Sequence, residues 1–178
     1  MGLRKILNEK DGEDAIALRK TSRAVTDFNK RLHKLLDDMR ETLIDANGLG
    51  LAAPQVGVLR RVVLVVDLSI ESEDIDDQII ELINPEIIAE SGEQTGNEGC
   101  LSLPGIYGIV SRPDTVKVRA FDRYGKPFEA FGEGLTARAF CHEINHLDGI
   151  IFTDLAERLL TPEELEAMMH EGEEDDEE

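Results

Sequence analysis

Residues 135–147 have the length of an α-helix, and their apolar side chains point in nearly every direction around the helix axis. A surface helix would carry an apolar stripe on one side only, so this helix is expected to be buried on all sides. Gly149 follows it as a stop signal. The apolar positions are Leu135, Ala137, Ala139, Phe140, Ile144 and Leu147. We therefore predict a central helix with the rest of the chain packed around it.

Two histidines and a glutamate interrupt this helix in the pattern His-Glu-Ile-Asn-His. His142 and His146 are four positions apart, so both imidazoles project from one face and can bind a single ion. Glu143 is rotated by about 100° from His142, near enough to act on a water molecule at the ion without being a ligand. The alternative is a chance match, with two core histidines bonded to the backbone. Burial of these groups is costly unless a metal or partners satisfy them, so the pattern favours a metal site.

A catalytic metal site usually has three protein ligands and an open position, so a third ligand is needed. Phe152 stands where a metzincin protease would have its third histidine. Glu157 follows His146 by only eleven residues, which is too few for a second helix to fold back. Cys100 lies in residues 96–105, GNEGCLSLPG, a glycine-dense loop of the kind that brings backbone close to a ligand. The alternative for a lone cysteine is a small buried hydrophobic side chain.

The residue pattern outside this helix predicts two further helices and a set of antiparallel strands. A long amphipathic helix has Thr26 as its N-cap and stops at Asn47, and a short helix begins with a capping box at residues 161–165. Strands are predicted at residues 61–68, 78–84 and 86–90, and a hairpin joins residues 114–121 to 127–131. The fold class is therefore α+β, with antiparallel β-sheets packed around the central buried HExxH helix.

The net charge and the length of the chain argue against several classes of function. The chain has 178 residues and a formal net charge of -19, which argues against direct nucleic-acid binding and against an anionic membrane surface. No apolar run reaches membrane-spanning length, and the start of the chain lacks the apolar segment of a signal peptide. Two cysteines are too few for a disulfide framework. We expect a cytoplasmic protein with one domain over residues 1–170 and an acidic, disordered tail at residues 171–178.

Three separated motifs resemble those of bacterial-type peptide deformylases, in the same order and spacing. They are GLGLAAPQVG at residues 48–57, EGCLS at residues 98–102 and HEINHLDG at residues 142–149. The similarity extends from about residue 18 to residue 155. The resemblance implies an α+β catalytic domain, in agreement with the pattern of helices and strands. It also implies a hydrolase that removes the formyl group from the N-terminal formylmethionine of newly made proteins.

The resemblance further implies a ligand set and a metal. Cys100, His142 and His146 match the three metal ligands of the family. Fe(II) is the expected ion, with zinc, nickel and cobalt as alternatives, because imidazole and thiolate suit this group of metals. The expected partners are N-formylmethionyl nascent peptides, with a transient ribosome contact as a further candidate. The acidic tail should repel ribosomal RNA, so such a contact would use another surface.

Catalytic roles follow from the same resemblance. Glu143 matches the general base, while Gln55 and the backbone N–H of Leu101 match the donors that stabilise the oxyanion. Gly48 and Gly50 would let the first motif approach an extended peptide substrate closely. Leu101 and Leu135, together with Ile106, are candidates for the wall of a methionine pocket.

Two positions depart from the family pattern. Cys141 stands where Gln is usual and Asn145 where Asp is usual, which bears on hydrogen bonding around the ligands and so on metal affinity. Two other functions compete with deformylation. A zinc endopeptidase would need a third ligand other than Cys100. A non-catalytic relative would have no reason to keep every matched catalytic position, and here each one is filled.

Overall fold

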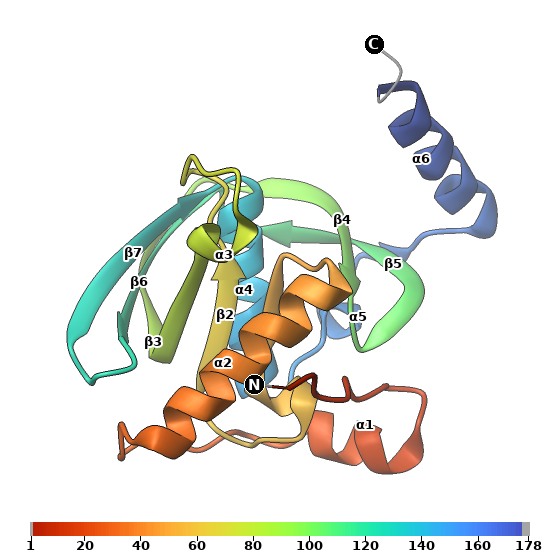
Figure 1. Cartoon of the computed structure of the whole chain (residues 1–178). Coiled ribbons are helices and arrows are strands. Elements are labelled where there is room, and N and C mark those ends of the chain that lie inside the picture. Colours follow the sequence, from red (N-terminus) through yellow and green to blue (C-terminus); the bar gives the residue numbers. More distant parts are fainter. Residues whose placement is uncertain (1, 176–178) are drawn as a thin grey trace.

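Helix α4 (Leu135–Leu147) lies at the centre of the molecule, as its all-round apolar pattern predicts, and only Leu135 and Asn145 in it escape burial (Figure 1). The computed structural model describes the backbone of residues 2–175 and the side chains of residues 2–171. Gly149, just beyond the helix, adopts a φ of 71°. A Cβ atom there would lie 2.2 Å from the Arg19 carbonyl oxygen, so only glycine fits.

The strands form two antiparallel sheets. The larger sheet has the order β1-β2-β3-β6-β7, and the smaller one has the order β4-β5-β8. The larger sheet contains β1 (Gly50–Ala52), β2 (Val62–Val66), β3 (Ile79–Ser91), β6 (Thr115–Phe121) and β7 (Pro127–Glu133). The smaller sheet contains β4 (Gln94–Cys100), β5 (Leu103–Arg112) and β8 (Arg158–Leu159). This arrangement confirms the predicted α+β class.

Strand β2 is buried on both faces because helices cover both sides of the larger sheet. Val62, Leu64 and Val66 point into a core shared with α2 (Lys30–Ala46), and the alternate residues Val63 and Val65 point into a core shared with α4. Figure 1 shows α2 and α4 on opposite sides of β2. The unbroken apolar run of this strand therefore reflects a three-layer arrangement.

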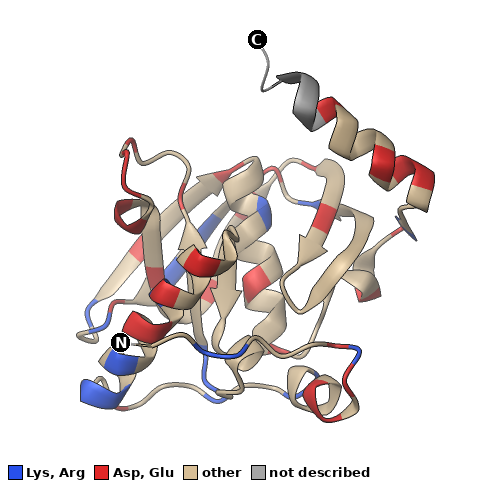
Figure 2. Ribbon diagram, turned by 45° about the vertical axis from the view of Figure 1, so that its right-hand side comes forward, with Lys and Arg blue, Asp and Glu red and all other residues tan. Residues whose placement is uncertain are grey.

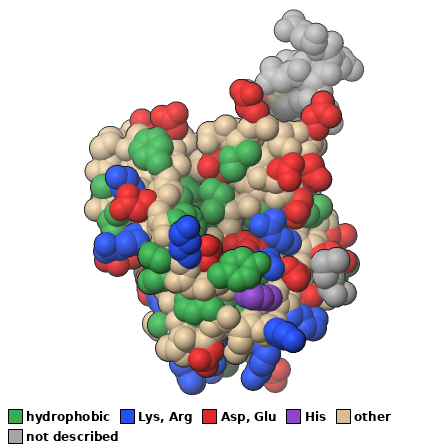
Figure 3. Space-filling view, turned by 60° about the vertical axis from the view of Figure 1, so that its left-hand side comes forward, with side chains coloured by type: hydrophobic (Ala, Val, Ile, Leu, Met, Phe, Trp, Pro, Cys, Tyr) green, Lys and Arg blue, Asp and Glu red, His purple; other side chains and the backbone are tan. Residues whose placement is uncertain are grey.

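The remaining helices are short or lie at the edge of the fold. They are α1 (Gly12–Leu18), the 3-10 helix η1 (Ala53–Val56), α3 (Ile75–Gln78), α5 (Phe152–Leu155) and α6 (Pro162–Asp175). None of the helices in residues 2–175 has the length and apolar character that crossing a bilayer requires. Acidic residues occur on most elements, and several lie along α6 (Figure 2). On the face shown in Figure 3, hydrophobic, acidic and basic side chains are interspersed.

Two helix boundaries differ from the sequence prediction. Helix α2 begins after Asn29, whose side chain accepts a hydrogen bond from Leu32 N at 3.1 Å, so the prediction of Thr26 as N-cap was wrong. Its predicted stop is confirmed, because Asn47 adopts the left-handed conformation with a φ of 54°.

Helix α6 begins as predicted, with Thr161 Oγ1 accepting from Glu164 N at 3.2 Å, but it continues to Asp175. It thus includes part of the segment expected to be a disordered tail, since glutamate favours helix; residues 176–178 lie outside the described chain.

Two strand predictions also change. The strands predicted at residues 78–84 and 86–90 are one strand, β3, which begins at Ile79 because residue 78 ends α3. Asn84 in this strand has a φ of 51°, and the pairing with β6 shifts register between Ile83 and Glu86. Residues 96–105 were predicted as a loop, whereas most of them belong to the hairpin of β4 and β5. Glycine and asparagine have low strand propensity, so the pairing with β5 decides this conformation.

Candidate metal centre

Three ligand atoms converge where the end of β4 meets the middle of α4. The ligand atoms of Cys100, His142 and His146 all lie within 4.8 Å of one another. Cys100 Sγ is 3.4 Å from His146 Nε2. The structure therefore brings together the two histidines predicted from helical spacing and Cys100. The sequence pattern by itself did not decide whether Cys100 is a third ligand or a buried hydrophobic side chain.

The buried carboxylate of Glu98 orients the first histidine. Its Oε1 atom lies 2.7 Å from His142 Nδ1, which leaves the Nε2 atom of the ring for the metal side. Burial alone would raise the pKa of Glu98, yet hydrogen bonds with Arg112 and His142 hold that pKa well below its ordinary value. The residue is therefore a carboxylate acceptor, and it maintains one orientation of His142.

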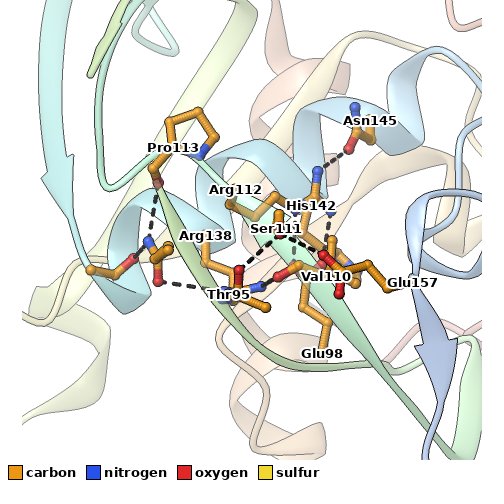
Figure 4. Close-up of polar contacts among 12 residues, drawn as sticks. Thr95, Glu98, Val110, Ser111, Arg112, Pro113, Arg138, His142, Asn145 and Glu157 are labelled. Carbon is orange, nitrogen blue, oxygen red and sulfur yellow. Dashed lines mark hydrogen bonds and ion pairs between the residues drawn. The ribbon is translucent and has the colours of Figure 1, made fainter. Parts of the chain in front are cut away.

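Two buried arginines surround Glu98 (Figure 4). Arg112 donates from Nε to Oε2 at 2.9 Å and from Nη2 to Oε1 at 2.8 Å, and Arg138 donates from Nη1 to Oε2 at 2.6 Å. Arg112 also donates to Asn145 Oδ1 at 2.5 Å. Asn145, one of the two departures from the family pattern, thus supplies a neutral acceptor to an arginine that is already paired.

This network was missed by sequence reasoning. Glu98 belongs to the EGCLS motif, but the sequence pattern predicts no role for it, for Arg112 or for Arg138. One signal was available: Arg138 is a charged residue in a helix predicted to be buried on all sides, and a buried charge requires a partner.

The two histidines have different electrostatic surroundings. Burial opposes a charge on His142, but hydrogen bonds with Cys100 and Glu98 raise its pKa to about 10. Burial and the proximity of His142 lower the pKa of His146 well below its usual range, so this ring is neutral. His146 Nδ1 has no hydrogen-bond partner among the described residues. The surroundings of His142 therefore favour a positive charge, and His146 presents a neutral imidazole beside it. This combination suits a metal cation.

The donor set agrees with this assignment. One thiolate and two imidazoles leave an open coordination position, as in catalytic sites of borderline transition metals. Phe152, at the position of the metzincin histidine, stacks on His142 with ring centroids 6.0 Å apart. Glu157 accepts a hydrogen bond from Ser111 on β5 at 3.0 Å and belongs to no metal-ligand cluster of the described residues.

Glu143 lies beside the ligands with an unused carboxylate oxygen. Its side chain is buried, and its Oε2 atom has no hydrogen-bond partner among the described residues. Burial raises the pKa of Glu143 to about 7, which suits a group that exchanges protons near neutral pH. Gly50 leaves the room that this side chain occupies.

Gln55, on η1, directs its amide group toward the same site. Its Oε1 atom accepts from Ala52 N at 2.9 Å, and its Nε2 atom lies 3.2 Å from Ser102 Oγ and 3.5 Å from Cys100 Sγ. The carbonyl oxygen is thus engaged by the backbone, and the NH2 group faces the thiol.

A cavity of about 500 Å³ opens beside Cys100, His142 and Glu143. Its walls come from the first motif, the β4–β5 hairpin and α4. Gly48, Gly50, Leu101 and Leu135 line it, whereas Ile106 is not among its lining residues. Gly48 also makes room for Leu101, because a Cβ atom on the glycine would lie 2.9 Å from Leu101 Cδ1.

The chain is similar to known proteins in both sequence and fold. Residues 4–161 match the family model described as polypeptide deformylase. A peptide deformylase of Caldicellulosiruptor bescii is 50% identical over 172 residues, 97% of this chain and 96% of the relative. One from Lachnoclostridium phytofermentans is 59% identical over 137 residues, 77% of this chain and 81% of the relative. The crystal structure of a peptide deformylase from Legionella pneumophila superposes with a TM-score of 0.77 at 40% identity, covering 94% of this chain and 96% of that one.

Proposed function

The chain belongs to the peptide deformylase family, and from that premise we propose that Cys100, His142 and His146 bind its divalent metal ion. The protein is a metal-dependent hydrolase that removes the formyl group from the N-terminal formylmethionine of newly made proteins and releases formate. The observation that carries the residue assignment is the approach of the three ligand atoms to within 4.8 Å of one another beside a buried glutamate.

Glu143 acts as the general base and then as the general acid. Cys100, His142 and His146 would hold a divalent ion, which would supply the Lewis acidity for the hydrolysis. Glu143 accepts the proton of the attacking water and later delivers it to the departing amine. Burial raises the pKa of Glu143 to about 7, which suits both transfers at neutral pH.

Gln55 and the backbone N–H of Leu101 stabilise the negative oxygen that develops as the formyl carbon becomes tetrahedral. The hydrogen bond from Ala52 N to Gln55 Oε1 holds the amide so that its NH2 group faces the site. Each such donor contributes roughly 3–4 kcal/mol in comparable hydrolases. Gly48 and Gly50 lie at the cavity wall, where the substrate backbone passes close to the first motif.

Fe(II) is the proposed ion, with zinc, nickel or cobalt as alternatives that the same ligands accept. The test is anaerobic purification and metal analysis, followed by a formate-release assay on a formylated peptide and on its unformylated counterpart. We expect formate from the formylated peptide only. Absence of formate release with all four metals would contradict the proposal, and cleavage of the unformylated peptide would point to an endopeptidase instead.

The substrates are newly made protein chains, which emerge from ribosomes. We therefore propose that the enzyme acts in the cytoplasm and makes transient contact with the ribosome. Helix α6 carries acidic residues along its length, so the contact surface lies elsewhere on the molecule.

A further inference from the structure

A second cavity, of about 430 Å³, opens at the N-terminal end of α2. Its lining comes from the start of the chain, the loop before α2, the first turns of α2 and the segment between η1 and β2. The cationic side chains in this lining are those of Arg4, Arg31, Lys34 and Arg60. The lining contains one carboxylate, that of Asp27. The proposed catalytic residues do not use this cavity, so its positive charge requires a separate explanation.

Two of the four cations lack a partner within the described part of the chain. Arg31 and Arg60 are exposed, and their side chains form no hydrogen bond or ion pair with the described residues. Arg4 and Lys34 share one partner, the buried carboxylate of Asp38, and each lies 3.0 Å from its Oδ2 atom. Four positive charges in the lining therefore stand against two carboxylates, this one and the one in the lining itself.

The positive surface extends beyond the cavity lining. Arg23 adjoins it, because this residue pairs with Arg60 in an isolated β-bridge. The first turn of α2 contains no acidic residue, so the positive end of the helix dipole adds to the same field. Figure 2 shows the start of α2 and the acidic helix α6 on opposite sides of the molecule. We define the basic surface as the side chains of Arg4, Arg23, Arg31, Lys34 and Arg60.

The net charge of -19 argues against nucleic-acid binding by the chain as a whole. At physiological ionic strength, however, exposed charges more than about 8 Å apart are largely screened from one another. An anion at the basic surface therefore responds to the cations around it, and hardly to the acidic residues on the far side of the molecule. This surface can bind an anion even though the net charge of the chain is negative.

The residues of the lining favour the phosphate backbone of RNA over other anionic ligands. None of the described lining residues is aromatic, so a nucleotide base would have no ring to stack on. None of them is an exposed large apolar residue of the kind that inserts into a membrane surface. Contacts with RNA phosphates need cationic and hydroxyl donors only, and Thr26 supplies a hydroxyl beside the arginines.

The basic surface and the substrate cavity lie at opposite ends of α2. Asn29 and Arg31 line the cavity at its start, and Asn47 and Gly48, just beyond its end, line the substrate cavity. The 17 residues of α2 span about 25 Å, so a partner bound at the basic surface leaves the substrate cavity open. An extended peptide covers this distance with about eight residues.

We propose that the basic surface docks the enzyme on the ribosome by binding backbone phosphates of ribosomal RNA. This inference rests on the proposed function, whose substrates emerge from ribosomes, and it names the surface that makes the contact. The contact is electrostatic and does not depend on base sequence. It holds the substrate cavity within reach of a newly made chain while leaving it free.

The experiment measures binding of the whole protein to purified bacterial ribosomes by co-sedimentation at several salt concentrations. The double variant Arg31→Gln, Arg60→Gln removes the two cations that have no partner within the described chain, so the fold should tolerate it. The control is Lys117→Gln, Arg119→Gln on β6, whose ion pairs are about half exposed and contribute little to stability. Both double variants have the same net charge, so a difference between them reports the position of the charges.

We expect Arg31→Gln, Arg60→Gln to bind ribosomes about tenfold or more weakly at physiological salt, because each lost phosphate contact also removes the release of counterions. The slope of log affinity against log salt concentration should become shallower by about 2, one for each cation. Lys117→Gln, Arg119→Gln should bind like the wild type. Unchanged affinity and slope in the first variant, or an equal loss in both, overturn the proposal.

Further arms test the identity of the ligand and keep docking separate from catalysis. ATP and phosphatidylglycerol vesicles replace the ribosomes, and binding to either of them without binding to ribosomes overturns the assignment to RNA. Formate release from a short formylated peptide should be equal in the wild type and both double variants, because none of the substituted residues lines the substrate cavity. A wild-type protein that releases formate but binds no ribosomes refutes the docking alone. Absence of formate release would instead refute the proposed function, while co-sedimentation would still test the basic surface.

Discussion

Gly50 packs against Glu143 so closely that a Cβ atom on the glycine would lie 2.6 Å from Glu143 Cγ and 2.8 Å from its Oε1 atom. The first motif and the HExxH helix are thus in contact at the residue proposed as general base. The glycine was expected to serve the substrate, and it also defines where the carboxylate of Glu143 can lie.

Gly50→Ala should therefore impair catalysis while leaving the metal in place. The added methyl group displaces Glu143, and a shift of about 1 Å in a catalytic group can lower turnover by about 10²-fold. Formate release and bound metal per chain are the measurements. Gly12→Ala is the matched control, since no atom lies within 4 Å of a Cβ at that position. Full activity in Gly50→Ala would show that Glu143 does not need this space.

Glu143→Gln keeps the shape of the side chain but removes its ability to accept a proton. Turnover should fall by at least about 10²-fold, the lower range for loss of a general base. Metal content should be unchanged, because the ligand atoms belong to other residues. Turnover like that of the wild type, measured with full metal occupancy, would rule out the assigned role.

The two cysteines should respond differently to removal. Cys100→Ala removes a thiolate ligand and should lose most of the bound metal and the activity. Cys141 is buried in the apolar core between α4 and the larger sheet, where burial raises the pKa of its thiol. Cys141→Ala should keep both metal and activity at a packing cost of about 1 kcal/mol. Metal analysis and formate release, both measured without oxygen, decide the comparison, and full metal in Cys100→Ala would refute the ligand set.

Glu81 should make stability depend on pH. Burial opposes its charge, but hydrogen bonds from Arg123 at 2.6 Å and Arg40 at 2.8 Å lower the pKa of Glu81 in the folded state. A lowered folded pKa stabilises the fold above the unfolded value, and this stabilisation is lost as pH falls through the folded pKa. Glu81→Gln should lower the free energy of unfolding by about 2 kcal/mol at pH 7.

The difference between wild type and Glu81→Gln should begin to shrink below about pH 4, where the glutamate of the unfolded chain becomes protonated. It should vanish as pH falls through the lowered folded pKa. Urea unfolding at several pH values measures it. Glu129→Gln is the control, because its pair with Lys117 is about half exposed and contributes little. A difference that stays constant with pH would show that the ion pairs of Glu81 are not its source.

Helix α4 shows what could be predicted from local patterns. Its bounds and its burial follow from the apolar periodicity, and the common face of His142 and His146 follows from their spacing of four, because helical geometry depends on neighbours in the chain. The hairpin β6–β7 was predictable for the same reason, since its polar and apolar residues alternate. The family resemblance added Cys100, Gln55 and the chemistry, which local patterns do not contain.

The sequence by itself thus determined the central helix, its two histidines and the class of fold. Only the tertiary structure decided that residues 96–100 form a strand and that Glu98 on this strand orients His142 and joins Arg138. The reason is physical: glycine and asparagine specify little local structure, and the contact from Glu98 to Arg138 spans forty positions. A buried arginine in an apolar helix indicates that a partner exists, but the packing of α4 against the β4–β5 hairpin decides which residue it is.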